Sequence, residues 1–126
     1  MLHAFSIVPL EAESRGKFVI LRNIHETYFV SAPLESHPYH ANIVYSFLQE
    51  GGRGRAKMAD PGFCTLLSQD WEILGGGFFE TKGQERVLVL SGKSTAYGRY
   101  PVDFIKKNGT NLPHDLGLLE YSLEIR

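Results

Sequence analysis

The chain has 126 residues and a mass of 14.2 kDa, and its 43% hydrophobic and 21% charged residues are ordinary globular usage, which excludes a disordered or fibrous chain. Its 13 basic and 14 acidic residues leave a net charge of −1, so a nucleic-acid binder with the usual basic excess is not expected. The single cysteine, Cys64, excludes an internal disulfide and a zinc site built from several thiolates.

No apolar run approaches the roughly 20 residues that span a bilayer. The segment from Met1 to Leu10 also lacks the basic flank and apolar stretch of a signal peptide. We therefore expect one domain over residues 1–126, in the cytoplasm, without membrane association and as a monomer or weak homo-oligomer.

The first third of the chain is typical of strands. Residues Phe5 to Val8 form a short apolar segment that ends at Pro9, which favours an edge strand. The segment from Lys17 to Ile24 is rich in alternating β-branched and aromatic residues and predicts a stronger strand. His25 to Ala32 either extends this strand or forms a second one.

A helix follows a loop that is bracketed by two prolines. Ser36 is suited to cap a helix from about His37 to Gln49, with Pro38 in its first turn, and Gly51 and Gly52 are suited to end it. The next stretch, Gly51 to Phe63, is expected to be a glycine-rich basic loop. Phe63 to Gln69 is expected to form a short helical turn.

The second half alternates strands with one further helix. Residues Trp71 to Leu74 are predicted to form a strand that is interrupted by three glycines, and Phe78 to Thr81 is predicted to be extended again. A turn is then expected to lead into a buried strand from Arg86 to Ser91. Pro101 and Gly109 are expected to bound a helix, and a last strand is expected from Leu118 to Ile125. The fold class is therefore α/β (α+β), with helices on the faces of one sheet.

Two motif-like features carry little chemistry. Gly92, Lys93 and Ser94 match the end of a phosphate-binding P-loop, but the glycine that the motif needs five residues earlier is Val87 in the buried strand. His37 and His40 have a spacing that could supply half of a metal site, but no third ligand lies at an informative distance, so we predict no metal.

Three other features suggest an anion site. His40 lies in the first turn of the predicted helix, where free amides favour an anion and the helix terminus lowers the pKa of the imidazole; the alternative is a surface histidine packed over Tyr39. The turn from Ser94 to Gly98 follows the most buried strand and could aim its amides at phosphate; the alternative is a simple connector. The triple glycine, Gly75 to Gly77, indicates a bulge or the close approach of another group.

The segments YHANI (39–43), LGGG (74–77), STAYG (94–98) and KFVILR (17–22) together resemble the Janus/Ocnus family of small phosphohistidine phosphatases, and the match covers most of the chain. The resemblance implies a six-stranded mixed sheet flanked by two helices, and hydrolysis of phosphohistidine without metal, cofactor or a covalent cysteine. It implies His40 as the catalytic base and Lys17 as the lysine that faces the phosphate. The expected phosphate-binding residues are Ala41, Ser94, Thr95, Ala96, Gly76 and Gly77.

The sequence departs from the family in its arginines. Phe78 stands where the phosphatase has an arginine after the triple glycine, and a second arginine upstream of the histidine is missing. We hypothesise that Arg53, Arg55 and Lys57 in the enlarged loop replace the lost charge; the alternative is a solvated surface loop.

Two functions remain open. The first is a phosphatase acting on phosphohistidine- or phospholysine-containing protein, or on a small phosphoramidate. The second is a non-catalytic module that binds a phosphorylated partner in the same pocket. A third, nucleotide binding through Lys93, depends on the incomplete P-loop.

Overall fold

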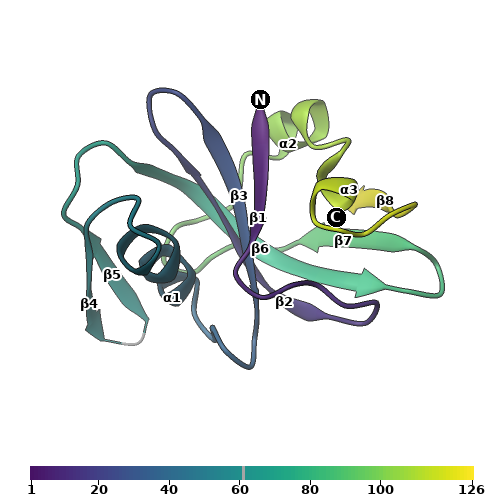
Figure 1. Cartoon of the computed structure of the whole chain (residues 1–126), viewed down its shortest axis with the longest axis horizontal. Helices are drawn as coiled ribbons and strands as arrows, with labels where there is room; N and C mark the ends of the chain where they lie inside the picture. The colour runs from purple at the N-terminus through teal and green to yellow at the C-terminus, as the bar shows by residue number, and fades with distance from the viewer. Residues whose placement is uncertain (61) are drawn as a thin grey trace.

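The computed structural model describes residues 1–60 and 62–126 and has a mixed α+β fold built on a curled six-stranded sheet (Figure 1). The sheet has the order β1-β3-β2-β6-β7-β8; β1 is parallel to β3 and β7 to β8, and the other neighbours are antiparallel. Its strands are β1 (Leu2–Ser6), β2 (Arg15–Arg22), β3 (Thr27–Pro33), β6 (Glu72–Lys82), β7 (Val87–Ser91) and β8 (Ser122–Ile125). The expected class and the mixed sheet of about six strands are confirmed, and the predicted edge strand exists, although it runs over Leu2–Ser6 and not from Phe5 to Val8. The described residues form three α-helices and a second, two-stranded sheet, and not the expected two helices on one sheet.

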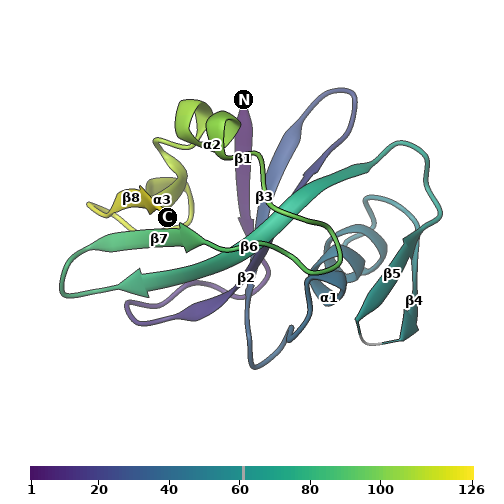
Figure 2. The same cartoon turned by 180° about the vertical axis from the view of Figure 1, so that it is seen from behind.

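The remaining elements cover the two faces of this sheet. On one face lie α1 (His40–Tyr45), the π-helical η1 (Ser46–Glu50) and a two-stranded sheet of β4 (Ala56–Asp60) and β5 (Phe63–Leu66). On the other face lie α2 (Val102–Asn108) and α3 (Leu112–Asp115). Figures 1 and 2 show that the two groups also occupy opposite ends of the sheet. No helix among the described residues is long and apolar enough to cross a membrane.

Strand β2 supplies side chains to both cores because successive residues of a strand point to opposite faces. Phe18 and Ile20 pack against α2 and α3, whereas Val19 and Leu21 pack against α1. All four are fully buried, and burial of each such side chain contributes about 1.5–3 kcal/mol. The predicted alternation of this strand is confirmed, and it fixes Lys17 on the same face as α1.

The first helix begins three residues later than predicted. Helix α1 starts at His40 with Tyr39 as its N-cap, so the proposed cap at Ser36 is wrong. The amide of His37 instead donates to the carbonyl oxygen of Pro33 at 3.0 Å, which closes a turn. Proline also disfavours the helical conformation in the residue before it, which is His37. The chain therefore enters the helix only after Pro38.

Most of the segment after η1 is a hairpin and not the expected loop and helical turn. Residues 51–55 are a loop as predicted, but the rest of the predicted loop and the helical turn are wrong, because Ala56–Asp60 and Phe63–Leu66 pair as antiparallel strands. Buried and exposed side chains alternate along the second of these strands: Cys64 is buried, whereas Phe63 and Thr65 beside it are exposed. Ala56 and Cys64 pack into the core beneath α1. The tertiary contact, and not local propensity, favours the extended form.

Strand β6 runs without a break through the triple glycine, contrary to the predicted interruption. The predicted bulge and close approach are both found there. The β2–β6 register shifts between Ile20 and Leu21, opposite Gly75. The segment after β7 crosses the same point, since an added Cβ on Gly75 would lie 2.3 Å from the carbonyl oxygen of Arg99. The glycines therefore make room for a second chain segment.

The C-terminal elements follow the prediction in part. Pro101 directly precedes α2 and Gly109 directly follows it, so the expected helix is confirmed with a one-residue shift. The last strand begins at Ser122 and not at Leu118, because α3 and a turn occupy the preceding residues.

Candidate active site

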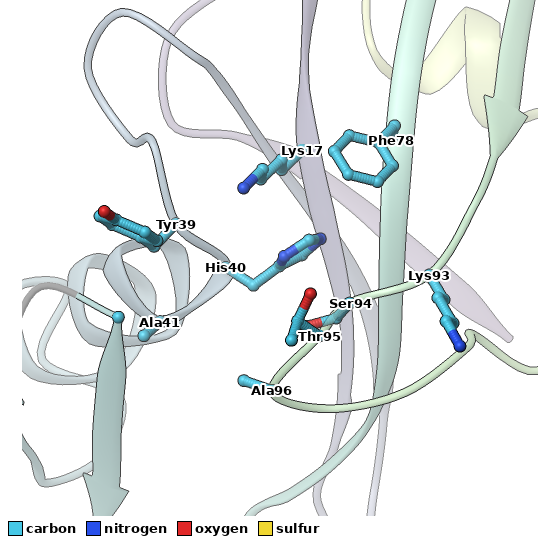
Figure 3. Close-up of a pocket in the computed structure, with 10 residues that line it drawn as sticks. Lys17, Tyr39, His40, Ala41, Phe78, Lys93, Ser94, Thr95 and Ala96 are labelled. Carbon is cyan, nitrogen blue, oxygen red and sulfur yellow. The ribbon is translucent and has the colours of Figure 1, made fainter.

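A cavity of about 460 Å³ lies where the start of α1 meets the turn after β7. Figure 3 shows that its labelled residues come from β2, α1, β6 and that turn, with Lys17, Phe78 and Ser94 around His40. We call it the His40 cavity; it is lined by Lys17, Tyr39, His40, Ala41, Gly62, Phe78, Lys93, Ser94, Thr95 and Ala96. Six of the eight residues predicted as base, lysine and phosphate-binding residues lie in this lining, and they come from three separate segments; the other two, Gly76 and Gly77, are not in it.

His40 is held against strand β6. Its side chain is 5% exposed, and its Nε2 lies 2.9 Å from the carbonyl oxygen of Gly77. Because a carbonyl oxygen only accepts, Nε2 carries the proton and Nδ1 keeps its lone pair. The alternative of a surface histidine over a buried Tyr39 is wrong, since Tyr39 is the exposed member of the pair.

The protonation state of His40 follows from its surroundings. Burial lowers its pKa below the usual value, the hydrogen bond to Gly77 opposes this, and the positive charge of Lys17 lowers the pKa further. The imidazole is therefore neutral at physiological pH. A neutral histidine with a free nitrogen is the form that accepts a proton in general-base chemistry.

Gly76 and Gly77 support this histidine and do not line the cavity. A Cβ on Gly76 would lie 2.8 Å from Cδ2 of His40 and 2.6 Å from the carbonyl oxygen of Phe18. The edge of the His40 ring also faces Phe78, at 5.7 Å between centroids. The glycines predicted as phosphate ligands thus act as the surface on which the imidazole rests.

Lys17 projects from β2 into the cavity between two aromatic side chains. Its Nζ donates to the carbonyl oxygen of Pro38 at 2.7 Å and lies 5.6 Å from the ring centroids of both Tyr39 and Phe78. Cation–π contacts at this distance attract the ammonium group without neutralising its charge. Within the described part of the chain, no carboxylate lies within ion-pairing distance of Lys17.

The turn after β7 presents unused donors to the cavity. Ser94 and Gly98 exchange backbone hydrogen bonds of 3.1 and 2.8 Å, and the amide of Tyr97 donates to Oγ of Ser94 at 3.1 Å. Among the described residues, the amides of Thr95 and Ala96 have no such acceptor. The hydroxyl proton of Ser94 is likewise left to donate. Adjacent free amides of this kind form an anion-binding nest.

Tyr97 anchors this turn to the hairpin side of the fold. Its side chain packs with the core beneath α1, and burial next to Cys64 raises its pKa to about 12. Ala41 completes the cavity from the first turn of α1, where backbone amides have no acceptor within the helix.

The basic residues of the hairpin region do not reach the cavity. The guanidinium of Arg53 lies 4.8 Å from the ring of Phe5 and 4.3 Å from that of Phe47, and it donates to the carbonyl oxygen of Phe47. Arg55 and Lys57 are also absent from the lining. The hypothesis that these three residues replace the missing arginines therefore has no support from their position.

The cavity lining also contains residues that the sequence analysis did not assign to the site. Phe78 could have been found from strand parity, because its neighbour Phe79 is buried on the opposite face. Gly62 arrives with the β4–β5 hairpin, for which no local signal exists. Lys93 lines the cavity, but Figure 3 shows its amine directed away from His40.

The structure supports neither the P-loop interpretation nor the metal-site interpretation. A P-loop needs a helix directly after its lysine, whereas the turn of residues 94–98 follows Lys93 and the next helix begins at Val102. His37 points elsewhere than His40, with hydrogen bonds of 2.8 Å to Ser36 and Ser46. In the described ranges, no group of three or more metal-ligating side chains occurs.

No protein-family model and no curated protein matches the sequence. The geometry of the His40 cavity is therefore the basis for assigning a function.

Proposed function

We propose that this protein is a phosphatase that hydrolyses phosphohistidine, or a related phosphoramidate, with His40 as general base. The observation that supports this best is the fixed, neutral His40: its Nε2 donates to Gly77, so its basic Nδ1 is available in a cavity with a lysine and free amides. The resemblance to the Janus/Ocnus family supports the same conclusion independently of this geometry.

The proposed reaction has one chemical step. The Nδ1 of His40 takes a proton from a water molecule as the water oxygen forms a bond to phosphorus and the P–N bond breaks. The electron pair of that bond passes to the departing nitrogen, which takes a proton from solvent, and His40 later returns its own proton to solvent. The products are the unphosphorylated histidine side chain and inorganic phosphate. General-base catalysis of this kind contributes about 10²–10⁴-fold to a rate.

The remaining cavity groups suit the charge on the transferring phosphoryl group. The ammonium of Lys17, the amides of Thr95 and Ala96 and the hydroxyl of Ser94 are all donors in the same lining. Donors fixed before the reaction stabilise negative charge without reorganisation. The step calls for neither a metal nor a cofactor, so we expect hydrolysis to continue in the presence of a chelator.

We further propose that the substrate is a phosphohistidine- or phospholysine-containing protein in the cytoplasm.

The single buried thiol, Cys64, has its pKa raised by burial and is unsuited to covalent catalysis. This supports the water-based mechanism over a cysteine phosphatase mechanism.

Histidine replacement tests the proposal. We expect His40→Ala to lower kcat for phosphohistidine hydrolysis at least about 100-fold. The matched control is His37→Ala, which removes a nearby histidine that does not line the cavity and should keep most of the activity. Full hydrolysis by a folded His40→Ala variant would contradict the assignment.

One observation favours a non-catalytic alternative. The cavity wall at Phe78 is apolar where a phosphatase of this type has an arginine, so the site offers fewer charges to an electron-rich transition state. A phosphate-binding module would bind phosphate analogues in the His40 cavity and show no turnover above background. Measurement of both binding and hydrolysis on the same preparation separates the two functions.

A further inference from the structure

The sheet face that carries the His40 cavity is covered at one end only. Val19 and Leu21 of β2 lie beneath α1, whereas Arg15, at the start of the same strand and on the same face, is exposed. Figure 1 shows α1 and the β4–β5 hairpin on one side of the sheet, with β7 and the end of β6 extending beyond them. The structure therefore leaves open sheet surface next to the cavity.

A second cavity, of about 220 Å³, lies on this open surface and shares Phe78 with the His40 cavity. We call it the Arg15 groove; its polar and charged lining residues are Arg15, Glu80, Ser91 and Arg126. Phe78 is 40% exposed and forms the boundary between the two hollows. A ligand that fills the His40 cavity can continue across this ring into the groove.

The two linings are positive although the chain as a whole is not. They contain Lys17, Lys93, Arg15 and Arg126 and one carboxylate, Glu80, in a chain of net charge −1, although the amine of Lys93 is directed away from His40, so Lys17 and Arg15 are the cations that face the two hollows (Figure 3). Arg126 is paired with Glu124. Arg15, by contrast, has no carboxylate within 4.0 Å in the described part of the chain, even though Glu80 is its cross-strand partner.

The spacing of these cations matches that of an extended polypeptide. Arg15 and Lys17 are two residues apart on one strand face, about 6.6 Å along the strand. Side chains two positions apart in an extended substrate have the same spacing and also point to one side. A peptide whose phosphorylated side chain enters the His40 cavity would thus place the side chain two residues away above the groove.

We propose that the Arg15 groove binds an acidic side chain two residues from the phosphorylated residue of a polypeptide substrate, with its backbone crossing Phe78. This inference rests on the proposed function in one respect, that the His40 cavity holds the phosphoryl group. It adds the substrate class: a phosphorylated polypeptide with a neighbouring carboxylate, in preference to a small phosphoramidate or a basic peptide.

The test uses extended peptides that contain a non-hydrolysable phosphonate analogue of phosphohistidine, with Glu or Gln two residues away on either side. Binding is measured by fluorescence anisotropy. We expect wild-type protein to bind a Glu peptide about three- to fivefold more tightly than its Gln counterpart, the effect of one exposed ion pair. This preference should shrink in 0.5 M salt.

Two substitutions on β2 provide the comparison. Arg15→Gln should abolish the preference for the Glu peptide, whereas Arg22→Gln, at the other end of the strand and paired with Glu72, should retain it. Equal binding of both peptides to wild type, absence of binding to either, or a preference that persists in Arg15→Gln would overturn the inference. Failure of the phosphatase proposal is recognised separately, as absence of phosphohistidine hydrolysis while the analogues still bind.

Discussion

Replacement of Gly76 by alanine isolates the contact that holds His40 against strand β6. The new Cβ would lie 2.8 Å from Cδ2 of His40 and 2.6 Å from the carbonyl oxygen of Phe18. An ordinary carbon contact begins near 3.4 Å, so the imidazole must retreat by about 0.6 Å, and the contact with the Phe18 carbonyl oxygen requires a shift of the backbone as well. The Nε2–oxygen distance to Gly77, now 2.9 Å, would then approach 3.5 Å, and the hydrogen bond would be lost.

Both consequences have a calculable size. Overpacking of a filled interior costs about 1–3 kcal/mol, and a buried donor left without its acceptor costs a similar amount. Together these costs are about 2–6 kcal/mol, and for a domain of this size 1 kcal/mol corresponds to about 4 °C in Tm, so we expect Gly76→Ala to lower Tm by about 8–24 °C. Displacement of a catalytic group by a large fraction of 1 Å lowers activity by as much as about 100-fold.

Thermal unfolding by circular dichroism and NMR titration of the His40 ring protons measure these effects. Gly62→Ala is the matched control, because it lines the same cavity and its added Cβ would lie 3.7 Å from the nearest atom, in the ring of Tyr39. We expect the control to leave Tm and the His40 titration unchanged. A Gly76→Ala protein with wild-type Tm and wild-type His40 titration would refute the argument that the glycine positions this histidine.

The remaining predictions concern charge. Phe78→Arg places a guanidinium in the cavity wall, so this variant should bind phosphate about tenfold more tightly than wild type in calorimetry. The control Phe78→Leu should bind phosphate no more tightly than wild type. Equal phosphate affinities of Phe78→Arg and wild type would contradict the reasoning. Burial lowers the pKa of both His37 and His40 in the folded protein, so the unfolded chain binds more protons below about pH 6.5. The free energy of unfolding from urea titrations should therefore be constant between about pH 7 and pH 8 and fall as the pH drops through 6.5, with a smaller fall in His40→Gln. Stability that rises on acidification would show the opposite sign of linkage.

Most of the sheet could be predicted because strands with one buried face carry a period of two. The alternation of Phe18 to Leu21 located β2 and its two faces, and the run from Val87 to Leu90 located β7. The triple glycine was informative for a physical reason, since side-chain-free backbone in a strand usually accommodates another group. Here that group is His40 together with the segment around Arg99.

The hairpin at Ala56–Asp60 and Phe63–Leu66 could not be predicted in the same way. Its strands are short and mostly exposed, so their pattern carries little signal. What stabilises them is the burial of Ala56 and Cys64 against Phe47, a contact between segments that the local sequence does not encode.

Local pattern in the sequence was enough to predict a sheet with helices on its faces and to single out His40 and the turn of residues 94–96 as candidate site residues, and the family resemblance added Lys17 and the mixed sheet of about six strands. The folded chain was needed to bring those segments around one cavity, to set the Nε2 proton of His40 on Gly77, and to add Tyr39 and Phe78 beside Lys17. It also separated Arg53 from the site by holding it between Phe5 and Phe47. These outcomes depend on contacts between residues far apart in the chain, where packing and burial override what neighbouring residues favour.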